Sequence, residues 1–125
     1  MNDMHSLFAQ TKSHQPAIED LLTHLRKTLP SGRLCCHDNT AGLITLPHDE
    51  PPDAEIVRHL VRAAGKASEP TGAIRDTAGT TLCLPIRMYD CYLLYRENDC
   101  SILSEDRVQL VQSVTRLYLL TRERF

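Results

Sequence analysis

The run Thr81-Leu82-Cys83-Leu84-Pro85-Ile86 decides the fold of this chain, together with the segments that follow it. Every second residue of the run is leucine or isoleucine, which is the period of a strand with one buried face. The next segment, Cys91–Tyr95, is apolar on both faces, as in a central strand. Ser104 is then typical of a helix N-cap, and residues 108–120 repeat apolar side chains at steps of three and four. The sequence therefore predicts two adjacent strands followed by a long amphipathic helix.

The part of the chain before this unit predicts a helix, two strands, a second helix and a short strand. The first helix opens at Gln15-Pro16, because proline suits the first helical turn, and its apolar stripe ends at Leu29. A flexible or short helical lead-in is expected at residues 1–14. The other elements are expected at Arg33–His37, Ala41–Leu46, Asp53–Ala67 and Gly72–Asp76.

The connections between neighbouring strands are short, and short connections favour antiparallel pairing. We therefore expect one α+β domain, residues 1–125, with a five-stranded, mainly antiparallel sheet and helices on both faces. The first and last helices should cover one face, and the helix Asp53–Ala67 should cover the other. Parallel central strands, or a helix over residues 81–86, would contradict this expectation.

Composition excludes several classes of function. The formal charge of -2 provides no basic excess for phosphates, so we expect no nucleic-acid partner. No apolar run approaches the roughly 20 residues that span a bilayer, and the N-terminus lacks the pattern of a signal peptide. We therefore expect no membrane association and a cytoplasmic location. The five irregularly spaced cysteines are typical of a reducing compartment.

Three segments carry a resemblance to a known family. Leu82–Ile86 is similar to the strand that GAF domains often end with a valine- or leucine-proline step, and Cys91–Tyr95 fits the strand after it. Ile102–Asp106 is similar to the phenylalanine-(Ser/Thr)-x-Glu-Asp entry to the last helix of that family. The resemblance implies a GAF/profilin-like sandwich and a non-catalytic regulatory or sensory role in bacterial-type signal transduction. That role would work through dimerisation or contact with a signalling protein, with a pocket for a small-molecule ligand.

The same order of elements also resembles the roadblock family of dimeric adaptors. The short connection from Asp76 to Thr80 suits that family better, because GAF domains usually place a helix and loops there. This second resemblance implies a dimeric adaptor without a ligand. Neither resemblance implies an enzyme, a cofactor or a catalytic residue.

Five residues are candidates for binding a small ligand. Cys35 and His37 share one face of a predicted strand, because strand side chains alternate. Tyr89 and Tyr95 share a face, and with Arg87 they could line a small pocket. The alternative for the tyrosines is an aromatic ladder across neighbouring strands.

The cysteines leave a third function open, a redox or metal sensor. Cys35 has Arg33 as a nearby cation that would favour a thiolate, whereas the acid Asp99 precedes Cys100. A zinc site would normally show paired Cys-x-x-Cys or His-x-x-x-His spacing, and neither pair occurs. We therefore expect no metal, and buried thiols acting as small hydrophobic residues.

The last helix has more apolar surface than one face of a sheet needs, so its other edge is expected to form a dimer interface. The first helix is the natural neighbour, and two such pairs would build a four-helix bundle around a twofold axis. The alternative is that one subunit uses the whole apolar breadth. The expected interface residues are Leu21, Leu22 and Leu25 of the first helix, and Leu110, Val114 and Leu117 of the last.

Overall fold

The computed structural model describes residues 14–47, 49–66 and 73–123. The lead-in expected at residues 1–14 lies outside the described residues except for His14, which is already helical. Each element lies within a few residues of its expected place. The elements are α2 (His14–Thr28), β1 (Gly32–Asp38), β2 (Gly42–Thr45), α3 (Ala54–Lys66), β3 (Ile74–Arg75), β4 (Thr81–Ile86), the 3-10 turn η1 (Arg87–Tyr89), β5 (Cys91–Glu97) and α4 (Glu105–Glu123).

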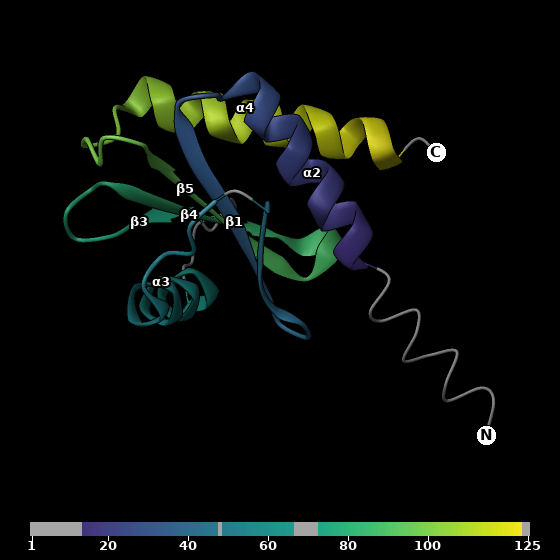
Figure 1. Cartoon of the computed structure of the whole chain (residues 1–125), viewed down its shortest axis with the longest axis horizontal. Helices are drawn as coiled ribbons and strands as arrows, with labels where there is room; N and C mark the ends of the chain where they lie inside the picture. The colour runs from purple at the N-terminus through teal and green to yellow at the C-terminus, as the bar shows by residue number, and fades with distance from the viewer. Residues whose placement is uncertain (1–13, 48, 67–72, 124–125) are drawn as a thin grey trace.

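The strands form one five-stranded sheet in the order β2-β1-β5-β4-β3 (Figure 1). All four pairings are antiparallel, which confirms the expected α+β class. The sheet is open, with β2 and β3 at its edges. β1 and β5 pair along their whole length, from Gly32 opposite Glu97 to Asp38 opposite Cys91. The most apolar strands therefore lie at the centre, where both faces need cover.

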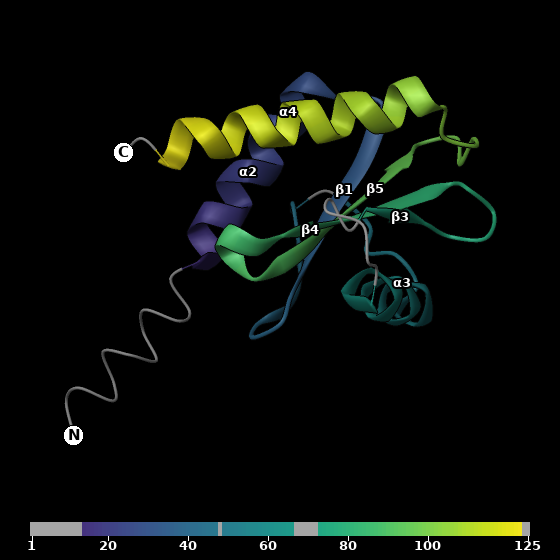
Figure 2. The ribbon, with the colours of Figure 1, turned by 180° about the vertical axis from the view of Figure 1, so that it is seen from behind.

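Helices cover the two faces of the sheet as the sequence predicts. Figures 1 and 2 show α2 and α4 crossing each other on one face, with α3 alone on the opposite face. Alternation along β1 explains the division, because Leu34 and Cys36 join the core under α2 and α4, whereas Cys35 joins the core under α3. The larger core lies between the sheet and the pair α2–α4.

A tight turn that begins at Asp76 joins β3 to β4, and the Asp76 side chain holds it. Its carboxylate oxygen Oδ1 accepts hydrogen bonds from the backbone N–H groups of Thr80 (2.9 Å) and Thr81 (3.2 Å). Gly79 has a φ of 75°, which favours glycine, and its carbonyl accepts a hydrogen bond from the N–H of Leu103 at 2.9 Å. These bonds fix the turn against the segment that leads into α4.

The beginning of α4 is defined by a cap. Ser104 accepts a hydrogen bond on Oγ from the N–H of Arg107 at 3.1 Å, which confirms it as the N-cap. Arg75 on β3 donates to the carbonyl of Leu103 at 3.0 Å and pairs with Glu105. The edge of the sheet and the cap together set where α4 starts.

The far end of α4 is attached to α2 by polar side chains. Asp20 of α2 accepts hydrogen bonds from Tyr118 and Arg122 of α4, and the Arg122 guanidinium lies 5.2 Å from the Tyr118 ring centroid. These hydrogen bonds and the Arg122 charge lower the pKa of Asp20. With both ends held, α4 lies across the sheet in one direction, which decides the side chains it exposes.

Candidate functional site

The outer face of α4 carries an apolar stripe. Four side chains define it, and we call them the α4 stripe: Leu110, Val114, Leu117 and Leu120. Leu117 is 64% exposed, Leu120 is 47% exposed and Leu110 is 41% exposed, while Val114 is half-buried. The opposite face of the helix already fills the core with residues such as Val111. Val114 packs partly against the core, whereas the three leucines of the stripe keep much of their surface exposed.

The expected contribution of the first helix to a dimer interface is wrong. Leu21, Leu22 and Leu25 have no exposed surface at all in the folded chain. They belong to the core that α2 forms with the sheet, since α2 lies against β1 and β2 as well as against α4. The apolar breadth of α2 is thus used within one chain, whereas α4 keeps Leu110, Leu117 and Leu120 exposed.

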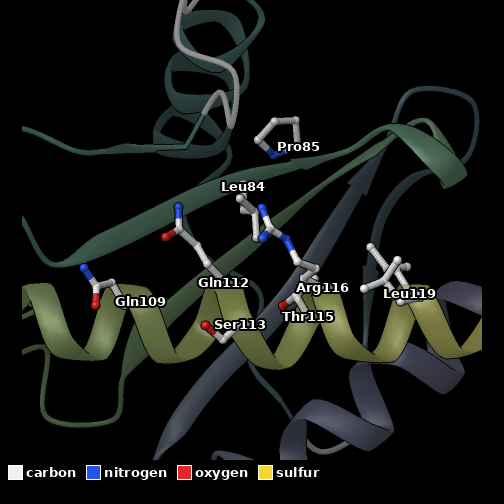
Figure 3. A pocket seen from close by; sticks show the side chains of 9 residues that line it. Leu84, Pro85, Gln109, Gln112, Ser113, Thr115, Arg116 and Leu119 are labelled. Atoms are coloured by element: carbon white, nitrogen blue, oxygen red, sulfur yellow. The ribbon is translucent and has the colours of Figure 1, made fainter.

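A pocket of about 430 Å³ lies between β4 and α4 (Figure 3). We call it the β4–α4 pocket. This volume is within the range of pockets that hold small molecules. Figure 3 shows Gln112 and Arg116 reaching from α4 toward β4. The pocket is lined by Leu84, Pro85, Gln109, Gln112, Ser113, Thr115, Arg116, Leu119 and Leu120.

Arg116 gives this pocket a positive charge, and the lining contains no aspartate or glutamate. Among the residues that the structure describes, Arg116 has no ion pair, although Arg26 binds Asp49 and Arg107 binds Glu97. A cation without a neighbouring acid attracts an anion into a partly enclosed space. The pocket therefore combines a positive charge with apolar walls.

The five residues predicted to bind a ligand do not form one site. Cys35 and His37 lie on the α3 face of the sheet, whereas Tyr89 and Tyr95 lie in the core on the α2–α4 face. Arg87 is exposed on η1. Because strand side chains alternate between the two faces of the sheet, the sheet separates the side chains of Cys35 and His37 from those of the two tyrosines.

The tyrosines have structural partners. The expected place of Tyr89 on the same strand as Tyr95 is wrong, because Tyr89 belongs to η1. Its ring lies 5.7 Å from that of His14. Tyr95 is 1% exposed and donates a hydrogen bond to Glu97 at 3.0 Å. Burial and this bond raise the pKa of Tyr95 to about 12. The hydroxyl is therefore neutral and engaged, and it does not face a ligand.

A second, smaller cavity of about 110 Å³ lies on the α3 side, and Cys35 and Tyr95 contribute to its lining beside Arg33 and Arg96. Burial, reinforced by the nearby Asp49, raises the pKa of Cys35 to about 12 despite the opposing effect of Arg96. The thiolate form that redox chemistry needs is absent at neutral pH. Arg33, the cation expected to favour a thiolate at Cys35, does not prevent burial from raising the pKa of this thiol.

The other cysteines follow the same pattern. Burial raises the pKa of Cys83 to about 12, and a hydrogen bond with Cys91 together with burial raises the pKa of Cys36 well above its ordinary value. Cys100 alone is exposed among the five.

In residues 14–47, 49–66 and 73–123, no three side chains that could bind a metal ion lie close together. None of the helices described is long and apolar enough to cross a membrane.

The sequence reading did not identify the β4–α4 pocket. Its polar wall comes from Gln109, Gln112 and Arg116, at the spacing i, i+3 and i+7 that places side chains on one face of a helix. This spacing is visible in the sequence, but glutamines on a helix ordinarily face solvent, so it does not by itself predict a pocket.

No family model, characterised protein or solved structure matches this chain.

Proposed function

We propose that this chain is a non-catalytic regulatory domain of GAF-like architecture that acts by pairing with a second copy of itself through α4. The observation that supports it is the α4 stripe, whose leucines are exposed although the core is complete without them. Small soluble domains rarely expose adjacent large apolar side chains except at an interface. We expect this role to be carried out in the cytoplasm, with a signalling protein as the downstream partner.

The α4 stripe is suited to pairing with the same stripe on a second copy of the chain. In an antiparallel pair of α4 helices centred between Ser113 and Val114, Leu110 of one copy meets Leu117 of the other. The same contact repeats on the other side of the twofold axis, as a symmetric dimer requires. Ser113 is small and exposed, so the helices approach closely at the crossing. Asp106 then faces Thr121 of the other copy, and no like charges are opposed.

Crosslinking tests this arrangement. We expect Ser113→Cys, in a Cys100→Ser background, to form a covalent dimer with a short bismaleimide, because the two introduced thiols lie near the twofold axis. Removing Cys100 is necessary because it is the exposed native thiol, and the four buried thiols are protected. Denaturing electrophoresis measures the fraction of covalent dimer.

The control is Arg58→Cys in the same background, on an exposed position of α3 at the opposite side of the sheet. It should remain monomeric on the gel at equal protein concentration. Efficient crosslinking through position 58 but not through position 113 would place the interface on α3 and contradict the proposal.

A second candidate function is a roadblock-type adaptor without a ligand. The tight turn between β3 and β4 favours it, because the connection from Asp76 to Thr80 leaves no room for the helix that walls the pocket of GAF domains. The two candidates share self-association and differ in ligand binding. The third alternative, a cysteine sensor, is disfavoured by the burial of Cys35, Cys36, Cys83 and Cys91.

A further inference from the structure

One wall of the β4–α4 pocket comes from the end of β4. β3 has two residues and pairs with β4 only at Leu82 and Cys83. The next residues of β4, Leu84 and Pro85, therefore have no outer neighbour among the described strands, and they form one wall of the pocket. Pro85 lacks an N–H group, so this edge offers one fewer donor to an added strand. The missing donor disfavours an added peptide strand and favours a small molecule as the ligand.

The opposite wall is a row of hydrogen-bond donors on α4. Gln109 and Gln112 carry amide groups, and Arg116 carries a guanidinium group one turn further along. In the described part of the chain, none of these three side chains has a hydrogen-bond partner. Their polar groups are therefore free to bind a ligand without breaking an internal contact.

The remaining lining is apolar. Leu84 is 8% exposed, and Leu119 is half-buried against the core, so both present fixed hydrocarbon surface to the pocket. Thr115 adds no free hydroxyl hydrogen, because its Oγ1 donates to the carbonyl of Val111 at 2.7 Å. The pocket thus combines one cation, two amides and an apolar wall.

We infer that the β4–α4 pocket binds a small organic carboxylate with an apolar body. Arg116 pairs with the carboxylate, since a guanidinium matches its two oxygens. Gln112 donates to the same group, and the hydrocarbon body lies against Leu84 and Leu119. Inorganic phosphate would satisfy the cation but leave the apolar wall uncovered, so the pocket prefers the organic acid.

This inference goes beyond self-association, although the pocket shares Leu120 with the α4 stripe and Ser113 with the proposed helix crossing. Amide chemical-shift titration of the full chain tests it, with phenylacetate and hexanoate as probes. We expect saturable shifts at residues of β4 and α4 around the pocket. Phenylacetamide, which has the same body without the charge, and inorganic phosphate should each bind at least about tenfold more weakly. Repeating the titration on the Leu117→Glu variant separates ligand binding from pairing.

Substitutions assign the binding to the pocket. Arg116→Gln should weaken phenylacetate binding by about tenfold or more, since it removes the cation and keeps hydrogen-bonding capacity. Gln112→Glu should weaken it similarly by adding a negative charge. The matched control Arg62→Gln, on the exposed face of α3, should leave the affinity unchanged. An absence of saturable shifts with both probes, or equal affinity in Arg116→Gln and the unmodified chain, would overturn the inference.

Discussion

Replacing Gly32 by alanine should lower the free energy of unfolding by about 1–3 kcal/mol, the usual cost of overpacking a filled core. A Cβ at position 32 would lie 2.2 Å from Cε1 and 2.8 Å from Cζ of the Tyr95 ring. The ring cannot easily move away, because Tyr95 is 1% exposed and its hydroxyl is bonded to Glu97. Urea denaturation followed by circular dichroism measures the difference between the two proteins.

Gly65→Ala is the matched control. Gly65 lies on the exposed side of α3, and a Cβ there would meet only the hydroxyl of Tyr92 at the ordinary distance of 3.4 Å. Because alanine favours a helix over glycine, this change should leave stability unchanged or raise it by up to about 1 kcal/mol. If Gly32→Ala were as well tolerated as Gly65→Ala, the packing of Tyr95 over the start of β1 would be wrong.

Leu22→Ala should be at least as damaging, with a loss of about 2–5 kcal/mol from the free energy of unfolding. Leu22 has no exposed surface and lies in the core between α2 and the sheet, so its truncation leaves a cavity that a fixed sheet cannot close. Thermal and urea unfolding at low protein concentration, where the chain is monomeric, would measure the loss.

Leu117→Ala provides the contrast, since Leu117 is 64% exposed on the α4 stripe. In the monomer it should change stability by no more than about 0.5 kcal/mol, as for most surface substitutions. The sequence predicts both leucines at an interface, whereas the structure buries Leu22 in the core and exposes Leu117. A small loss from Leu22→Ala, comparable with that from Leu117→Ala, would contradict this division.

The sequence predicted the elements and layers well because they depend on local periodicity. Alternation in residues 81–86 and the run Cys91–Tyr95 locate β4 and β5, and Ser104 locates the start of α4 to within a residue. Short connections explain the antiparallel pairing of β1 with β2, of β3 with β4 and of β4 with β5. These sequence signals are local, so tertiary packing does not shift the elements by more than a few residues.

The candidate binding sites were predicted less well, because they depend on which faces of the helices and strands pack together in the folded chain. The tyrosine at position 89 continues the spacing of a strand, but the chain turns at η1, where Asp90 adopts a φ of 52°. The leucines of α2 and α4 look alike in the sequence, and only the fixed ends of α4 decide which face it turns outward. The β4–α4 pocket required a further fact, the position of α4 beside the end of β4, which periodicity does not reveal.

Sedimentation of the unmodified chain beside Leu117→Glu tests the central claim most directly. The charge at position 117 would be buried against Leu110 of the other copy, at a cost that pairing cannot offset. Gln112→Glu is the control, because it adds the same charge to α4 on the pocket side. At high micromolar concentration we expect twice the chain mass of 14.1 kDa for the unmodified chain and for Gln112→Glu, and a single mass for Leu117→Glu. A single mass for the unmodified chain, or an undiminished dimer in Leu117→Glu with its fold intact, would contradict self-association through α4.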